Sequence, residues 1–408
     1  YGEGKPYDKR SNKNCVPVDV GYNVEESLPA LLLYAILMDD NQVLSKITES
    51  LHAHAEFMLP DGGWDNSWGT RNFKWTYWGS RTCDGCQPAY ALLADKYPEF
   101  YKVAYENTNL LINCTENKLL HGGPHYMSHG ILPCIHHTFC HAKALASVLN
   151  HKIPEPHKNI NNVKLPRSKE YGVKTFTDIQ TYLIAKGDWR ATITGYDREY
   201  YIKNGHATGG ALTLLWHKEC GLVLSASMND YQLVEQNNMQ IHSDPYLMPL
   251  TPRLQYTETG VHYMNISDLS ASINHDETEE AITFYTQSGL VDEFQNNPSM
   301  GRINSHIDYR IENRSIHIVI KGKQEMPRGS RFIIPIISTK NQKVEIKDKQ
   351  VSIHKDSGII NVVGNTIPEI LPSQNGRIFN YVPGMEAVPI AFKFDNSRMI
   401  KVKIFFDK

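Results

Sequence analysis

Apolar residues in the first 150 positions recur three or four apart, which is the spacing of an amphipathic helix. One such run follows Asn23, a second follows the probable cap Asn41, and a third covers roughly residues 86–97. Two more runs begin near Pro98 and near Pro133. Helices in series pack as antiparallel hairpins, so the pattern predicts an array of about five helices.

The pattern changes to alternation beyond residue 168. Residues 151–168, HKIPEPHKNINNVKLPRS, are polar and hold three prolines without periodicity, which predicts a linker. The segments that follow, such as ALTLLWHKECGLVLSASM and MIKVKIFF, are rich in β-branched and aromatic residues that alternate with polar ones. Strands without intervening helices predict an antiparallel sandwich. The predicted fold class is α+β, with a helical domain at residues 1–160 and a large β-sandwich at residues 161–408.

The composition narrows the range of partners and locations. Apolar residues make up 41% and charged residues 21% of the chain, and the net charge is −2. This charge creates no strong field for nucleic acid, so we expect no nucleic-acid partner. No run of about 18 apolar residues occurs, so we expect no membrane insertion. The chain begins at Tyr1 without a signal-like segment, which indicates either a removed leader or a trimmed sequence, and we expect a secreted or periplasmic protein. The oligomeric state is left open.

Cysteine and histidine spacing leaves a metal ion as an alternative. Cys83 and Cys86 form a C-x-x-C without a second pair, which favours a local disulfide or two buried thiols. On the last predicted helix, His136–Cys140 and His137–His141 are pairs four residues apart that can chelate zinc. Packed histidines explain the same spacing. A structural zinc or calcium ion remains an alternative, and the chemistry considered below requires no cofactor.

Two loops between the predicted helices combine glycines with aromatic and polar side chains. Antiparallel hairpins place every second connection at the same end, so residues 59–79 and 118–131 are expected to share one rim. The first loop contains DGGWDNSWGTR. Tryptophan rings stack on sugar rings, while arginine and asparagine bind carboxylates and hydroxyls. The candidate substrate-binding residues here are Trp64, Trp68, Arg71, Trp78 and Arg81, with Asn66 as a candidate catalytic residue. The alternative is that the tryptophans fill the core.

The second loop and one segment of the β half carry candidate proton-transfer residues. The loop KLLHGGPHYMSHGI offers His125, Tyr126 and His129. Histidine carries protons near neutral pH, and a tyrosine beside cations can act as a base. The segment GYDREYYIKNGHATGG places His206 between glycines. Its neighbours Tyr196, Arg198 and Tyr200 are further candidates for substrate binding. A solvated polar loop is the alternative for the histidines of the second loop.

These motifs resemble those of the heparinase II/III-like polysaccharide lyases. The similar features are the DGG-Trp loop with Asn66, the Pro-x-Tyr-x-x-His loop with Tyr126, and the Gly-His-x-x-Gly-Gly segment with His206. The resemblance implies an (α/α) toroid followed by an antiparallel sandwich, and about five helices imply an incomplete toroid. The family's His-x-His-x-Asp motif is replaced here by His206-Ala-Thr-Gly.

The resemblance implies β-elimination at a uronic acid of an acidic polysaccharide. Asn66, with Arg71 or a histidine, would neutralise the carboxylate and stabilise the enolate-like state. Tyr126 would remove the C5 proton or protonate the leaving O4, and His206, His125 or His129 would take the other role. Hydrogen-bond donors alone can hold the oxyanion, so no metal is needed.

Two other functions fit the same residues. A glycoside hydrolase needs a carboxylate pair, for which the candidates are Asp61, Asp65, Asp197 and Glu199. A non-catalytic carbohydrate-binding protein would keep the tryptophans without needing Tyr126 or His206. Product absorbance in the ultraviolet separates a lyase from both.

Overall fold

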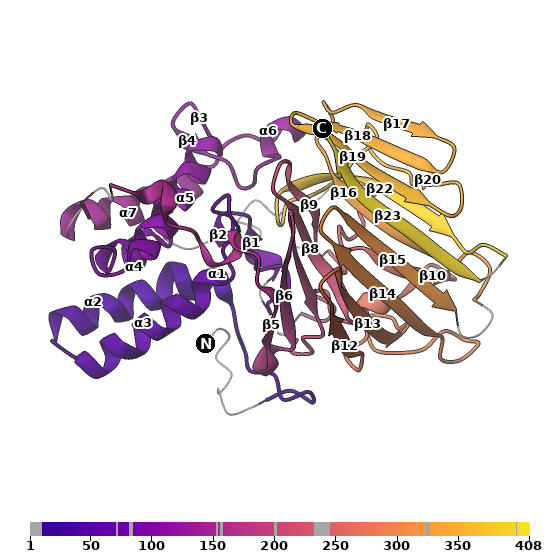
Figure 1. Cartoon of the computed structure of the whole chain (residues 1–408), viewed down its shortest axis with the longest axis horizontal. Coiled ribbons are helices and arrows are strands. Elements are labelled where there is room, and N and C mark those ends of the chain that lie inside the picture. Colours follow the sequence, from indigo (N-terminus) through magenta and orange to yellow (C-terminus); the bar gives the residue numbers. More distant parts are fainter. Residues whose placement is uncertain are drawn as a thin grey trace.

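The computed structural model describes residues 10–70, 72–80, 85–151, 154–155, 158–199, 202–231, 245–322, 326–396 and 398–408. Helices fill one side of the molecule and sheets fill the other (Figure 1). This arrangement confirms the predicted α+β fold class. None of the helices described is long and apolar enough to cross a bilayer.

The helices begin and end near the predicted positions. Asp40, rather than Asn41, caps the second long helix, because its carboxylate accepts from the backbone N–H groups of Gln42 and Val43. Pro98 occupies the first turn of its helix, where its missing N–H is not needed. A π-helical turn, Asn23–Ser27, precedes the first long helix. The helices are α1 (Val20–Tyr22), α2 (Leu28–Leu37), α3 (Asn41–Ala55), α4 (Gln87–Leu92), α5 (Pro98–Asn113), α6 (Tyr126–His129) and α7 (Ile135–His151).

Three large antiparallel sheets form the β half. The first, in the order β5-β6-β7-β8-β9, lies next to the helices (Figure 1). Its strands are β5 (Gly172–Phe176), β6 (Thr181–Lys186), β7 (Trp189–Thr194), β8 (Ala211–His217) and β9 (Gly221–Ser225). The second, in the order β11-β10-β16-β22-β20 with β21 also on β22, contains β10 (Arg253–Glu258), β11 (Val261–Met264), β16 (Arg331–Ile337), β20 (Glu369–Ile370), β21 (Ile378–Asn380) and β22 (Met385–Lys393).

The third sheet has the order β12-β13-β14-β15-β23-β19-β18-β17. Its strands are β12 (Ser272–Glu277), β13 (Ala281–Gly289), β14 (Asn304–Glu312), β15 (Ser315–Gly322), β17 (Val344–Lys347), β18 (Gln350–Lys355), β19 (Gly358–Gly364) and β23 (Met399–Asp407). Two short hairpins belong to the helical half: β1 (Trp75–Thr76) with β2 (Gly79–Ser80), and β3 (Thr115–Glu116) with β4 (Leu119–Leu120).

Strand alternation produces the core between these sheets. In β23, Ile400, Val402 and Ile404 are buried, while Lys401 and Lys403 between them are exposed. A single apolar cluster takes residues from all three sheets, including Ile193 of the first, Ile334 of the second and Ile318 of the third. The sandwich predicted from the alternating pattern is therefore present.

A buried ion pair holds the first loop of the helical half against the first sheet. Arg167 Nη1 lies 2.6 Å from Asp65 Oδ2, and both side chains have an exposed fraction of 0%. Arg167 Nη2 also donates to the carbonyl of Ala191 at 2.9 Å and to the hydroxyl of Thr192 at 3.2 Å. Ser67 donates to Asp65 at 2.6 Å. These bonds fix the position of the DGGWDNSWGTR loop relative to β7.

Candidate active site

The tryptophans of the first loop are core residues. Trp64, Trp68 and Trp78 each have an exposed fraction of 0%. The Trp68 ring meets Tyr196 edge-on at 5.5 Å between centroids. This corrects the expectation that the rings lie exposed for stacking on sugars. The ion pair of Asp65 pulls the loop onto the sheet, so its aromatic faces pack inward.

Asn66 is buried in the same loop, and the oxygen of its side-chain amide is unsatisfied among the described residues. Its exposed fraction is 1%, and among the residues described its Oδ1 has no hydrogen-bond partner. Oδ1 of Asn72, whose Nδ2 donates to the Asn66 carbonyl at 3.3 Å, is also without a partner within the described ranges. A Cβ on Gly69 would lie 2.5 Å from Asn66 Oδ1, so glycine is needed there. Buried polar atoms without partners are costly and commonly mark places where a ligand or water binds.

His206 is buried next to Tyr196. Its Nε2 lies 3.3 Å from the carbonyl oxygen of Tyr196, and Asn229 Nδ2 donates to the His206 carbonyl at 3.0 Å. Burial lowers the pKa of His206, although the bond to Tyr196 acts to raise it. The imidazole is therefore neutral near pH 7. When Nε2 donates its hydrogen to the carbonyl, the lone pair lies on Nδ1, which is then able to accept a proton.

The first loop and the His206 segment lie side by side. Trp68 contacts Tyr196, and the Tyr196 ring lies 5.6 Å from that of His206. Phe73 of the loop packs with Ile202 of the segment in one apolar cluster. The structure therefore brings the neighbourhoods of Asn66 and His206 together.

The other predicted binding residues have mixed outcomes. Tyr196 is buried, and its hydroxyl donates to the Val16 carbonyl at 2.8 Å and accepts from Val18 N at 3.2 Å, so it is not the substrate-binding residue expected. Arg198 is buried on the same segment. Three further candidates fall outside the described residues: Arg71, Arg81 and Tyr200.

Tyr126 lies elsewhere, against the second sheet. It is fully buried, and its hydroxyl donates to the Tyr381 carbonyl at 2.8 Å. His125 Nδ1 accepts from the backbone N–H of Glu386 at 3.0 Å. His129 Nδ1 lies 3.2 Å from Glu386 Oε1, and its ring stacks on Phe379 at 4.1 Å. The 118–131 loop thus docks on β21 and β22.

Strand β8 separates the two groups. His206 precedes the first residue of β8, whereas His125 lines a cleft of about 390 Å³ with Glu219 and Cys220, which follow its last residue. Seven residues at about 3.3 Å each give a strand roughly 20 Å long. Tyr126 bonds the Tyr381 carbonyl next to β21, whereas His206 bonds the Tyr196 carbonyl after β7, so the two side chains pack against different sheets. The joint action of Tyr126, His125 and His129 with Asn66 and His206 on one sugar stays a prediction.

The cleft beside His125 contains several titratable groups. Burial, followed by the charge of Lys355, lowers the pKa of His125 to about 4. Burial also lowers the pKa of Lys355 to about 8. The pKa of Asp61 is raised by burial, although Trp216 Nε1 donates to its carboxylate at 2.9 Å. The lining of this cleft is nevertheless open to solvent in part, because Glu219 and Asp356 are exposed.

The carboxylates considered for a hydrolase are occupied by other partners. Asp65 binds Arg167. Asp197 accepts from the Ser11 hydroxyl and, at 2.8 Å, from Lys13 N. Glu199 accepts from Lys203 Nζ at 2.8 Å and from Asn204 N at 2.9 Å. This arrangement gives no support to a catalytic carboxylate pair.

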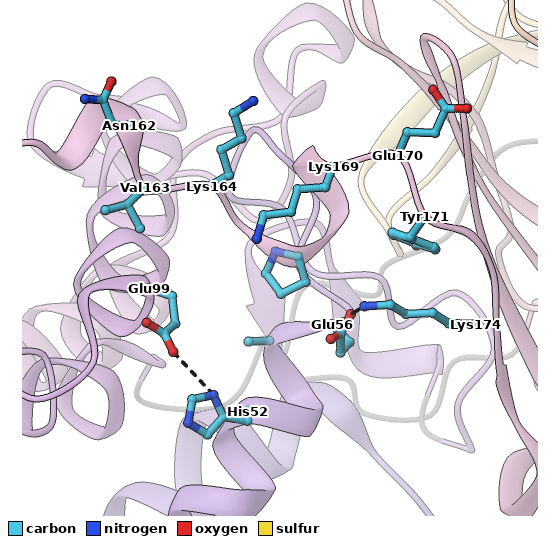
Figure 2. Close-up of a pocket in the computed structure, with 12 residues that line it drawn as sticks. His52, Glu56, Glu99, Asn162, Val163, Lys164, Lys169, Glu170, Tyr171 and Lys174 are labelled. Carbon is cyan, nitrogen blue, oxygen red and sulfur yellow. Dashed lines mark hydrogen bonds and ion pairs between the residues drawn. The ribbon is translucent and has the colours of Figure 1, made fainter.

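A cavity of about 640 Å³ lies between α3, α5 and residues 162–174 (Figure 2). Its walls carry groups of both charge signs: Lys174 bonds Glu56 at 2.5 Å, and the His52 ring lies 3.6 Å from the Glu99 carboxylate. None of the residues predicted from the sequence as site residues lines it.

The histidines of α7 pack rather than converge. The His137 and His141 rings meet Trp78 edge-on at 6.1 and 5.7 Å. His136 Nε2 lies 3.9 Å from Cys140 Sγ. Within the described ranges, no group of three or more His, Cys, Asp or Glu side chains is arranged to hold a metal ion. Cys86 is a buried free thiol, and its predicted partner Cys83 lies outside those ranges.

Residues that the sequence did not single out complete the surroundings of His206. Asn229 has an exposed fraction of 4%, and its Oδ1 has no partner in the part of the chain described. It lines a cavity of about 280 Å³ between β10, β16 and residues 247–249. The sequence offered one signal for Asn229: it begins the polar pair Asn-Asp directly after a predicted strand, a position where binding residues are often found.

The fold and the site define a two-part protein, in which helical hairpins precede an antiparallel sandwich and a buried polar site lies where they meet. Residues 1–168 match the ulvan lyase N-terminal domain, and residues 173–407 match the ulvan lyase C-terminal domain. The chain belongs to the ulvan lyase family. This membership confirms the resemblance to polysaccharide lyases expected from the motifs.

One curated relative agrees with this assignment. A broad-specificity ulvan lyase of Formosa agariphila is 43% identical over 401 residues, which cover 97% of this chain and 62% of the relative. The chain therefore spans less than two thirds of that relative's length. The solved heparan sulfate lyase HepC mutant of Pedobacter heparinus aligns with a TM-score of 0.48 at 10% identity, covering 98% of this chain and 54% of the other. A chondroitin AC lyase of Streptomyces coelicolor aligns with a TM-score of 0.42 at 11% identity, covering 98% and 54%.

Proposed function

We propose that this chain is a polysaccharide lyase that cleaves a uronic-acid-containing polysaccharide, such as ulvan, by β-elimination. Membership of the ulvan lyase family supports the reaction class. The observation that carries the site is that two buried side chains lie on adjoining segments: Asn66, whose Oδ1 has no partner among the described residues, and His206, whose imidazole is neutral near pH 7.

The two residues divide the chemistry between them. The Asn66 amide donates a hydrogen bond to the uronate carboxylate, which reduces its negative charge and stabilises the enolate-like state. His206 Nδ1 accepts the C5 proton. The C5–H and C4–O4 bonds break and a C4=C5 double bond forms. The His206 imidazolium passes the proton it has taken to O4, which leaves as a hydroxyl. No cofactor is required, because donors in a water-poor site stabilise the developing charge.

The remaining predicted roles stay predictions. Arg198 lies on the same segment as His206 and is suited to a substrate carboxylate or hydroxyl, as are Arg71, Arg81 and Tyr200. An extracellular or periplasmic location fits the proposed substrate, because an intact polysaccharide cannot enter a cell unaided. A structural metal ion remains an untested alternative.

The test compares three variants on a uronate polysaccharide, with the unsaturated product followed by ultraviolet absorbance. We expect His206→Gln to reduce kcat by about 100- to 10,000-fold and Asn66→Ala by about 100- to 1,000-fold. The matched control is Tyr126→Phe, which removes one buried hydroxyl at the far end of β8 and should leave kcat within about threefold of wild type.

Four outcomes would contradict the proposal. The first is a His206→Gln variant with nearly full activity. The second is a folded Tyr126→Phe variant that has lost turnover, which would return Tyr126 to the reaction. The third is chain cleavage without ultraviolet absorbance, which indicates hydrolysis. The fourth is tight sugar binding by wild type without any product, which would identify a binding protein instead.

A further inference from the structure

Two arginines project from one face of the second sheet. In β10, Leu254 is buried in the main core, so its neighbours Arg253 and Gln255 point to the opposite face. In β16, Phe332 is likewise in the core, so Arg331 points with them. The register places Gln255 opposite Arg331. Two arginines therefore lie close together on the non-core face of this sheet, beside the apolar cluster of Ile333.

Arg253 is a buried cation without a buried anion beside it. Its exposed fraction is 1%. Its Nε donates to Gln255 Oε1 at 2.8 Å, and its Nη1 donates to the carbonyls of Pro249 at 2.9 Å and Thr251 at 3.2 Å. All three acceptors are neutral. Among the described residues, no carboxylate pairs with Arg253 or with Arg331. Buried arginines are rare unless an anion compensates them.

The two arginines line the cavity of about 280 Å³ that also contains Asn229 and His262. Arg253 and Arg331 both lower the pKa of His262, after burial, which reflects the positive field there. The carboxylate in the lining is Asp230, which is exposed and acts to raise the pKa of His262. The lining therefore carries two arginine charges against one carboxylate. The cavity volume lies just below the roughly 300 to 1,000 Å³ of pockets that hold drug-sized ligands. A single sugar unit is smaller than such a ligand, so the cavity has room for about one.

Asn229 connects this cavity to His206. Its Nδ2 donates to the His206 carbonyl at 3.0 Å, to Asn204 Oδ1 at 3.0 Å and to the Ile266 carbonyl at 2.9 Å. Its Oδ1 is buried and without a partner within the described ranges. The cavity is thus one side chain away from the proposed proton acceptor.

We propose that this cavity is a subsite for an acidic sugar unit next to the one cleaved, with Arg253 and Arg331 binding its sulfate ester or carboxylate. The inference rests on the proposed function, because the sulfate or carboxylate that binds the two arginines belongs to the polysaccharide that the proposed lyase cleaves. Guanidinium groups match the planar edge of a carboxylate and two oxygens of a sulfate equally well. Asn229 Oδ1 accepts from a hydroxyl of the same sugar.

The test uses Arg331→Gln, because Arg331 is only partly buried and its loss leaves the Arg253 bonds intact. On the natural acidic polysaccharide we expect KM to rise about tenfold, while kcat stays within about threefold, as for loss of one charged hydrogen-bonding group. Arg331→Lys should recover part of the affinity. The matched control is Arg310→Gln on β14. It also removes one positive charge, but Arg310 pairs with Glu312 and lies outside the cavity.

Removing sulfate from the polysaccharide identifies the group that is bound. If the difference between wild type and Arg331→Gln disappears on desulfated substrate, the arginines bind sulfate; if it persists, they bind a carboxylate. Both outcomes support the subsite. Equal KM values for Arg331→Gln and Arg310→Gln would overturn it.

Calorimetric titration with an uncleaved acidic oligosaccharide separates this inference from the proposed function. If wild type forms no unsaturated product but Arg331→Gln binds about tenfold more weakly than Arg310→Gln, the lyase proposal fails and the subsite stands. If wild type is an active lyase and the two variants bind equally, only the subsite fails.

Discussion

The chemistry proposed at His206 depends on burial keeping its imidazole neutral. Burial lowers the pKa of His206 below the ordinary value of 6.5. We therefore expect kcat/KM to stay level as pH falls through 6.5 and to decline only at lower pH, where the proton acceptor becomes charged. A pH–rate profile, with His206 followed by NMR titration, checks this. An acid limb centred at or above pH 6.5 would show that another group limits the reaction.

A second residue-scale prediction concerns the Asp65–Arg167 ion pair. Asp65→Asn should lower the free energy of unfolding by about 3 to 5 kcal/mol, because it leaves a fully buried guanidinium without its charge partner. Urea denaturation measures this. The control is Asp178→Asn, which breaks the exposed Arg10–Asp178 pair and should cost less than about 1 kcal/mol. Similar losses in both variants would argue against the structural role assigned to Asp65.

The sequence predicted individual site residues only where the neighbouring residues in the chain already made them unusual. His206 stood out because glycines flank it, and Asn66 because it sits in a loop of unusual composition. The tryptophans were misjudged because their burial depends on Asp65 meeting Arg167, 102 residues away. Arg253 could not be noticed at all, since a single arginine in an alternating strand is ordinary until the opposing strand is known.

At the scale of elements, the 118–131 loop is held on the second sheet by two glycines. A Cβ on Gly123 would lie 2.4 Å from the Cα of Gly384, which is backbone that cannot easily move. We expect Gly123→Ala to destabilise the protein by about 1 to 3 kcal/mol, as overpacking does. Thermal unfolding measures the effect.

The control for Gly123 lies in the same loop. A Cβ on Gly130 would meet nothing within 4 Å, and its φ of +82° is a conformation that asparagine tolerates. Gly130→Asn should therefore cost less than about 1 kcal/mol. If Gly123→Ala is equally mild, the loop does not approach β22 as closely as described.

Periodicity predicted which elements form but not where the loops between them go. The long helices α2, α3, α5 and α7 and the alternating strands agree with the sequence pattern, because each buries one apolar stripe or face. The docking of the second loop depends on contacts such as His125 with Glu386, which are 261 residues apart. No local signal encodes a pairing of that range. The expected shared rim is nevertheless supported in part, because Asp61 and Tyr77 of the first loop line one cleft with His125 of the second.

For the whole molecule, the histidines with a lowered pKa predict acid sensitivity. Burial lowers the pKa of each of His54, His121, His125, His206, His217 and His262. The unfolded chain binds protons near pH 6.5 while the folded chain does not, so stability is lost as pH falls through 6.5. With a folded pKa of about 4, His125 contributes at most about 2 kcal/mol of this loss at pH 5, and less to the extent that its partly exposed ring is solvated.

Urea denaturation at pH 7.5 and pH 5 measures the loss. In His125→Gln the difference between the two pH values should shrink, because that titrating group is gone. A wild-type free energy of unfolding that is the same at both pH values would contradict the prediction, as would an unchanged difference in the variant.

The guanidinium of Arg167 has a consequence for how such proteins can diversify. It precedes the boundary between the two matched domains, at residues 168 and 173, yet it bonds both Asp65 before that boundary and Thr192 after it. Recombination that exchanged one domain for a relative's would have to bring a compatible hydroxyl and carboxylate together around this cation. The two domains are therefore expected to be inherited as a matched pair, and chimaeras joined between them should fold only when these three side chains agree.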